Sequence, residues 1–145
     1  MKKTILLILI YFFLFIEFAL ARGDCDGVHM GSHTDMNGVE TLFCASYDSV
    51  MKSPEWDGKS DTPPLNIAEA ISIGQKWLKK ENPKLDVFQI REISISRVGN
   101  SEIKDRWYYS LDFQAVVGGR TLYGSPFNAV ILLDGTIVKP RILKD

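Results

Sequence analysis

Apolar residues between positions 66 and 83 recur at spacings of three and four, as they do along one face of an amphipathic α-helix. Asn66 is a favourable N-cap, and Glu69 follows three residues later, as in a capping box. Pro83 ends the pattern, because proline has no backbone N–H and disrupts a helix interior. We therefore expect a helix between Asn66 and Pro83 with one apolar face, formed by Ile67, Ala70, Ile71, Gly74, Trp77 and Leu78.

After Asp86 the apolar period changes to two, which is typical of β-strands. We expect four strands, at residues 87–98, 106–117, 122–133 and 136–142. Two of the reversals between them carry dipeptides typical of tight hairpins, Gly118-Gly119 and Asp134-Gly135. A break or bend in the third strand is expected at Gly124-Ser125-Pro126.

The phase of the alternation also predicts which side chains are buried. The second strand should bury Trp107 and Tyr109 and turn Tyr108 outward. In the first strand the inward phase slips at Arg91 and Glu92, which predicts a β-bulge. A helix stripe and a one-sided sheet can bury each other, so the expected fold class is α+β: one N-terminal helix packed on a four-stranded antiparallel sheet, over residues 65–145.

The segment from residue 22 to residue 64 lacks such a long periodic pattern. Acidic side chains outnumber basic ones in it, and its one clear strand candidate is Val39 to Ala45. Pro63-Pro64 favours an extended linker, because proline biases the residue before it away from helix. We expect residues 22–64 to form an acidic, loop-rich arm and linker ahead of the α+β domain.

The first 21 residues have the pattern of a secretory signal peptide. Lys2 and Lys3 precede an apolar run, and Ala19-Leu20-Ala21 is a small-x-small cleavage site. The alternative is a retained membrane anchor, but the apolar run is shorter than the roughly 20 residues of a spanning helix. Cleavage near Ala21 is therefore the expectation, and it predicts a secreted or periplasmic protein that meets the membrane only during export.

An oxidising destination decides how the two cysteines are interpreted. Cys25 and Cys44 should form one disulfide there, which would stabilise the arm by roughly 3 kcal/mol through loop closure. The alternative is a metal site, because Cys25, His29 and His33 follow a Cys-x3-His-x3-His spacing that Cys44 could complete for zinc. Oxidation would remove both thiolates, so we expect the disulfide and no metal or other cofactor.

No residue pattern predicts catalysis. The chain lacks a serine nucleophile elbow and a phosphate-binding glycine loop, and its carboxylates form no obvious acid and base pair. With 17 basic and 18 acidic residues and a net charge of −1, the chain also gives no basis for binding nucleic acid. The sequence therefore predicts a protein that is not an enzyme.

The order of one helix and then antiparallel strands, with Trp107-Tyr108-Tyr109-Ser110-Leu111 and Leu122-Tyr123 in the sheet, resembles cystatin-like inhibitors. Gln114 to Gly118 matches the Gln-x-Val-x-Gly pattern of that family. The family carries this pattern between the first and second strands after the helix, whereas here it falls between the second and third. The resemblance implies a shared layout, with protease inhibition as an alternative function.

The stretch from Pro63 to the end also resembles small exported bacterial domains of the PepSY-like kind. The similarity lies in an Ala-Glu-Ala segment in the helix, the Tyr108-Tyr109 strand and the closing hairpin from Asp134 to Val138. This resemblance implies a fold and a non-catalytic role, and it carries over no site residues. We expect the protein to bind another envelope or extracellular protein through the outer face or the edge of its sheet.

Overall fold

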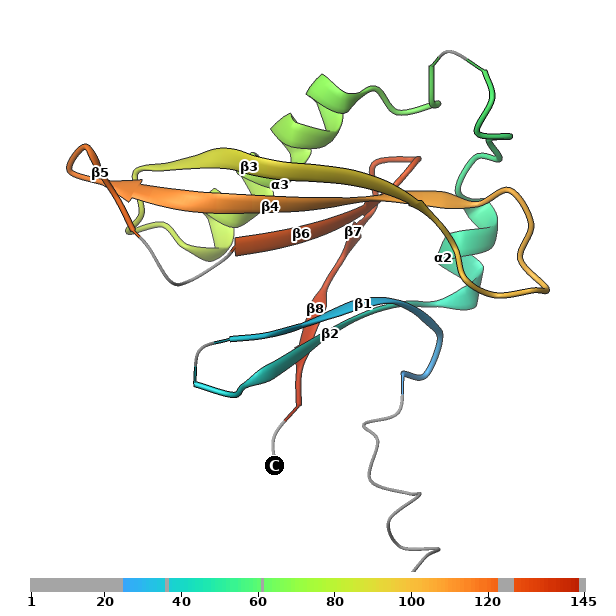
Figure 1. The fold of residues 1–145 in the computed structure, drawn as a ribbon, viewed down its shortest axis with the longest axis horizontal. Coiled ribbons are helices and arrows are strands. Elements are labelled where there is room, and N and C mark those ends of the chain that lie inside the picture. The colour runs from blue at the N-terminus through green and yellow to red at the C-terminus, as the bar shows by residue number, and fades with distance from the viewer. Residues whose placement is uncertain (1–24, 36, 61, 123–126, 144–145) are drawn as a thin grey trace, which may run out of the picture.

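The structure is a computed structural model that describes residues 25–35, 37–60, 62–122 and 127–143. The expected signal peptide at residues 1–21 and the expected strand break at Gly124-Ser125-Pro126 lie outside these residues. Two antiparallel sheets and two helices make up the described fold, which is α+β. Figure 1 shows their arrangement.

Helix α3, Ile67–Glu81, confirms the sequence prediction. The Asn66 side chain caps its first turn by accepting a hydrogen bond from the Glu69 N–H at 2.9 Å. Ala70, Gly74 and Leu78 lie on its buried face, whereas Ile67, which was expected on that face, is 51% exposed. Gly74 allows a close approach, because a Cβ there would lie 3.0 Å from the Phe113 ring of the sheet below. The helix therefore packs tightly along its apolar stripe.

The larger sheet has five strands in the order β3-β4-β6-β7, with β5 paired to β4. Their bounds are β3 Val87–Arg97, β4 Trp107–Val117, β5 Arg120–Thr121, β6 Phe127–Leu132 and β7 Ile137–Val138. The pairing of β3 with β4 shifts between Ile90 and Glu92, so the predicted bulge is confirmed. The turn at Gly118-Gly119 joins β4 to β5, and the turn at Asp134-Gly135 joins β6 to β7.

The predicted fourth strand, residues 136–142, is divided between two sheets. β7 pairs with β6, and β8, Pro140–Ile142, pairs instead with β2 of a smaller sheet. Pro140 gives the physical reason, because it has no N–H to continue the ladder beside β6. A single helix on one four-stranded sheet is therefore too simple a description of this chain.

The region expected to be loop-rich contains three regular elements: β1 Val28–Thr34, β2 Glu40–Ala45 and helix α2 Tyr47–Lys52. The predicted strand at Val39 to Ala45 matches β2. β1, β2 and β8 form a three-stranded sheet. The Cys25–Cys44 disulfide, with its Cα atoms 5.7 Å apart, joins the residues before β1 to the end of β2, as predicted. Asp26 lies 3.6 Å from Arg141 of β8, so the two ends of the described chain meet here.

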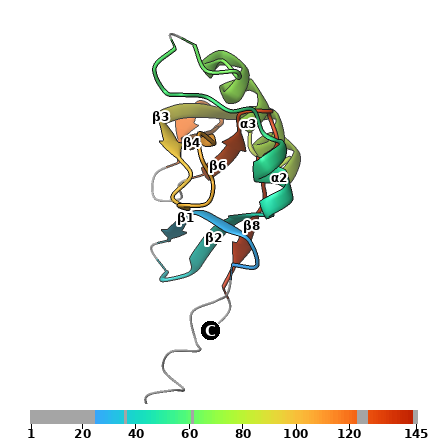
Figure 2. The same ribbon diagram turned by 90° about the vertical axis from the view of Figure 1, so that its right-hand side faces the viewer.

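The five-stranded sheet is the middle layer of the molecule. Figure 2 shows the three-stranded sheet below it and α3 at the upper right. Tyr109, Leu111 and Phe113 of β4 face α3, whereas Val130 and Leu132 of β6 belong to a second core with residues of β1, β2 and α2. Both faces of the sheet are therefore buried, at least in part.

This second core overturns the prediction that Tyr108 faces outward. The Tyr108 side chain is half-buried and packs against the second core, because the three-stranded sheet covers that end of the larger sheet. Removal of its phenol from water raises the pKa of Tyr108. Tyr109 is buried as predicted, and its hydroxyl donates a hydrogen bond to the Leu65 carbonyl oxygen at 2.8 Å.

Candidate functional site

A cavity of about 240 Å³ opens at the N-terminal end of β6, between the last turn of α3 and the β1–β2 hairpin. α3, β6 and the three-stranded sheet each contribute residues to its wall. The lining residues are His33, Thr41, Phe43, Trp77, Leu78, Glu81, Asn82, Phe127, Asn128 and Pro140. The cavity therefore draws on both sheets and on the long helix.

This space is open because the chain leaves the large sheet after β7 and pairs with the small sheet as β8. The Leu132 N–H donates to the Thr136 oxygen at 2.9 Å, so alternate residues of β6 turn their peptide groups toward β7. By the same alternation Asn128 turns its peptide groups to that side, where its partner in register would be residue 140. Pro140 instead pairs with Phe43 of β2. Among the described strands, the β6–β7 ladder thus ends at Val130, and the cavity lies beyond it.

The apolar part of the cavity is made mainly of large side chains. Trp77 and Leu78 lie on the face of α3 that packs against the sheet. The Phe127 ring is fixed by an edge contact with Phe88, at a centroid distance of 5.1 Å. Phe43, which lies on β2 of the three-stranded sheet, is also buried. The aromatic surfaces are therefore held by packing before any ligand enters.

Polar groups lie around these rings. His33 pairs with Thr41 on the same face of the small sheet as Phe43, because Gly31 and Phe43 are the neighbouring cross-strand pair. The Nε2 atom of His33 is buried and has no hydrogen-bond partner in the described part of the molecule. Buried polar atoms are normally paired, so an unpaired nitrogen at this position is an exception among the described residues.

Among the described residues of the lining, Glu81 and His33 have ionisable side chains and none is a lysine or an arginine. Lys80 and Lys139 are sequence neighbours of lining residues but are not part of the wall. Lys79, in the last turn of α3, donates hydrogen bonds from its ammonium group to the carbonyl oxygens of Pro83 and Leu85. The fixed charge of the site is therefore negative.

The four residues of the sequence-based metal hypothesis are not brought together. Cys25 and Cys44 are joined to each other, and His29 lies opposite Cys44. His33 lies on the other face of β1, because a register shift separates His29 from Gly31 and the cross-strand partner of His33 is Thr41. Only His33 of these four reaches the cavity. Sequence reasoning missed the remaining lining residues, since Trp77 and Leu78 were explained by the helix core alone.

The described residues contain no group of three or more histidine, cysteine, aspartate or glutamate side chains arranged to hold a metal ion. In the same part of the chain, neither helix has the length and apolar character needed to cross a bilayer. The disulfide is typical of proteins in oxidising compartments outside the cytosol.

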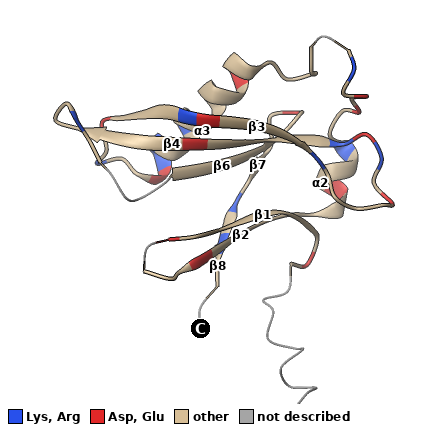
Figure 3. Cartoon of the chain, viewed as in Figure 1, with Lys and Arg blue, Asp and Glu red and all other residues tan. Residues whose placement is uncertain are grey.

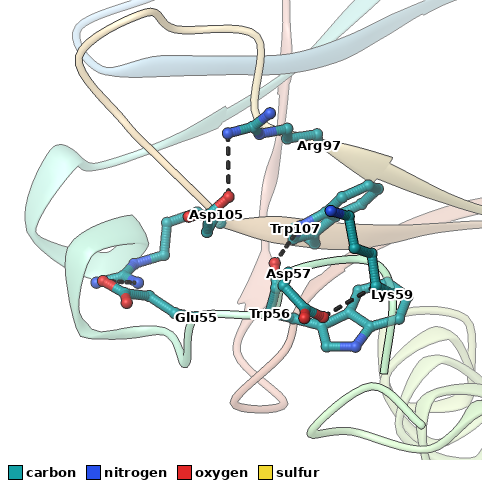
Figure 4. A network of polar contacts seen from close by, with 8 residues as sticks. Glu55, Trp56, Asp57, Lys59, Arg97, Asp105 and Trp107 are labelled. Carbon is teal, nitrogen blue, oxygen red and sulfur yellow. Dashed lines mark hydrogen bonds and ion pairs between the residues drawn. The ribbon is translucent and has the colours of Figure 1, made fainter. Parts of the chain in front are cut away.

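A second group of polar contacts fastens residues 53–60 to one end of the large sheet (Figure 4). The Trp56 N–H donates to the Asp105 oxygen at 2.8 Å, and Trp107 Nε1–H donates to the Trp56 oxygen at 2.6 Å. The two indole rings meet edge to face, with centroids 5.1 Å apart. Asp57 closes a turn by accepting the N–H groups of Ser60 and Lys59, which lower the pKa of its carboxyl group.

Arg106 extends this fastening into the second core. Its side chain is 9% exposed, and Nη1 lies 2.7 Å from Glu55 Oε1. Its Nη2 donates to the Met51 oxygen at 3.1 Å, at the end of α2. Arg97 Nη2 donates to Asp105 Oδ1 at 3.1 Å across the β3–β4 loop. These contacts are explained by their role in holding α2 and the segment after it in place.

Gly58 should be sensitive to substitution in this segment. Its φ is +71°, and a Cβ would lie 2.7 Å from Cζ2 of Trp107. We expect Gly58→Ala to lower the free energy of unfolding by about 2 kcal/mol, from backbone strain and the ring contact together. Urea unfolding followed by tryptophan fluorescence measures this change. An unchanged midpoint would show that the segment moves freely over Trp107.

The outer edge of β3 is a second candidate surface. β3 is the end strand of the large sheet and pairs only with β4 among the described strands. The Val98 N–H donates to the Arg106 oxygen, so alternation turns the peptide groups of Ile93, Ile95 and Arg97 away from β4. Figure 3 shows basic and acidic residues side by side on β3 and β4, which include the Arg91–Asp112 ion pair at 2.9 Å.

Comparisons with known proteins give no assignment: no family model, no curated protein and no solved structure matches this chain. The pentapeptide that resembles the cystatin pattern occupies the end of β4, from Gln114 to Val117, and the turn at Gly118. The function must therefore be argued from the cavity and the strand edge.

Proposed function

We propose that this chain is an exported, non-enzymatic domain that binds another envelope or extracellular protein, after removal of its signal peptide near Ala21. The observation that carries the proposal is the outer edge of β3 between Ile93 and Arg97. Peptide groups that face away from β4 there can pair with an extended segment of a partner, as in β-strand addition. The disulfide supports an oxidising location.

Part of the sheet surface that the sequence suggested for partner binding is buried. The three-stranded sheet covers Val130 and Leu132, so that part of the sheet's outer face is buried. The β3 edge has no such cover among the described elements. Ile93 and Ile95 are half-buried and pack against the α3 core, which leaves part of each side chain exposed beside the free peptide groups. A partner strand would gain both ladder hydrogen bonds and apolar contact.

The bulge and the charges of β3 would restrict which strands can pair. Exposed edge strands are commonly protected against random association by bulges and charged side chains. β3 has its bulge between Ile90 and Glu92, and Arg91 beside it is paired with Asp112. These features leave the stretch after the bulge as the regular part of the edge. We therefore propose recognition by a short extended segment rather than a long one.

The proposal is tested with a proline placed at the free edge. Ile95→Pro removes an N–H that faces away from β4, and edge strands tolerate proline. We expect this variant to lose capture of the partner from an envelope extract, while Ile95→Val retains it. In the complex, hydrogen exchange at the amides of Ile93, Ile95 and Arg97 should slow at least tenfold.

Circular dichroism first establishes that both variants fold. Repeated recovery of the wild-type chain alone would contradict the proposal. So would capture that survives in Ile95→Pro, or a complex in which the β3 amides exchange as fast as in the free chain. Each result separates strand addition from binding at another surface.

A further inference from the structure

We propose that the cavity between α3, β6 and the β1–β2 hairpin is a binding site for a small organic amine, a positively charged ammonium group carried on a single aromatic or branched aliphatic body. This site is separate from the β3 edge, because β3 and β6 lie on opposite sides of β4. The inference depends on the size, lining and charge of the cavity.

Size limits the ligand to a fragment. Sites for drug-sized molecules have volumes of roughly 300–1,000 Å³, whereas this cavity has about 240 Å³. One ring with a short side chain is enough to fill such a space. Trp77, Phe43 and Phe127 supply flat apolar surfaces for such a body.

Charge selects the head group of the ligand. The described lining has the carboxylate of Glu81 and neither a lysine nor an arginine, so an anion would enter against repulsion and without a basic partner in this part of the chain. An ammonium group would be attracted by the carboxylate and by the face of an indole ring such as Trp77. The polar lining therefore favours a cation over an anion of the same shape.

Hydrogen-bond capacity supports the same choice. Thr41 lines the cavity, and its hydroxyl oxygen can accept a hydrogen bond. Asn128 lines the cavity beside the end of the β6–β7 ladder. An ammonium group has three donors, so it can pair with the Glu81 carboxylate, which only accepts, and also with the Asn128 side-chain oxygen.

The test compares three probes that share one ring: 2-phenylethylammonium, 2-phenylethanol and phenylacetate. We expect the ammonium to bind at least tenfold more tightly than phenylacetate in NMR titrations that follow the Trp77 indole resonance. The neutral alcohol should bind with intermediate affinity. Trp56 and Trp107 lie outside the cavity lining, so their resonances serve as internal controls.

Two variants test whether Glu81 contributes to ammonium binding. Glu81→Gln should weaken ammonium binding about fivefold, the size expected of a solvent-accessible ion pair, and leave the alcohol unchanged. Glu69 lies in the first turn of the same helix, outside the cavity, so Glu69→Gln should change the affinity for neither the ammonium nor the alcohol. Added salt should weaken binding of the ammonium probe only.

Phenylacetate affinity equal to or above that of the ammonium would overturn the proposal. Failure of all three probes to shift Trp77 at millimolar concentration would also overturn it. Retained ammonium affinity in a folded Glu81→Gln variant would remove the charge argument and, with it, the assignment to amines. None of these results depends on whether the β3 edge binds a protein.

Discussion

Gly27→Ala should destabilise this protein by about 3 kcal/mol, the upper end of what overpacking normally costs. A Cβ at Gly27 would lie 2.2 Å from the carbonyl oxygen of Ala45 and 3.1 Å from its carbonyl carbon. These are backbone atoms at the end of β2, so no side-chain rotation relieves the contact. The substitution must push β1 away from β2 or break their pairing at Val28.

Urea unfolding of the wild type and the variant measures the effect. Gly99→Ala is the matched control, because no atom lies within 4 Å of a Cβ placed there and its φ is not in the left-handed region. We expect the control to change the free energy of unfolding by less than about 0.5 kcal/mol. Equal midpoints for Gly27→Ala and Gly99→Ala would contradict the contact between Gly27 and Ala45.

Loss of the disulfide should have an effect of similar size. Cys25 and Cys44 are separated by 19 positions in the sequence, and closing a loop of that length stabilises the folded state by about 3 kcal/mol in the loop-entropy description. The bond also holds the residues before β1 beside the end of β2. We expect Cys25→Ser/Cys44→Ser to unfold at a lower urea concentration than the oxidised wild type.

Reduction provides an independent measurement of the same quantity. Dithiothreitol should lower the urea midpoint of the wild type to that of the double variant and should not affect the double variant itself. An identical midpoint for the oxidised and reduced wild type would show that the small sheet holds without the bond. Near-ultraviolet circular dichroism would then report whether the Trp56–Trp107 pair is also retained.

The sequence allowed α3 to be predicted because all of its determinants are local. Asn66, the apolar stripe and Pro83 lie within a few turns of one another, and no distant residue is needed to interpret them. The bulge near Glu92 was also predictable, since it changes the phase of a long alternating strand. The local pattern was sufficient to predict an element wherever its determinants lie within that element or beside it in the sequence.

β1 and β8 could not be predicted in the same way. The register shift between His29 and Gly31 interrupts the alternation of β1, and glycine at that point favours a loop interpretation. β8 is too short to have a period of its own, and its partner β2 lies far away in the sequence. The position of Pro140 gave a usable clue, because proline cannot continue a paired strand.

The candidate cavity was harder to predict for the same reason. His33, Trp77 and Asn128 come from a strand, a helix and a second strand, and each has an ordinary explanation in its own element. His33 was considered with the cysteines because it is near them in the sequence. Its actual neighbours were determined by the face of β1 on which it lies, which the bulge reverses.

The pairing of β2 with β8 also constrains when the protein can finish folding. β2 ends at Ala45 and β8 begins at Pro140, so one edge of the middle strand of the small sheet is paired by a segment that lies far later in the sequence. Contacts between such distant segments form slowly, because a long loop must close first. Until β8 pairs with it, one edge of β2 must therefore remain unpaired, and unpaired strand edges make a folding intermediate prone to aggregate.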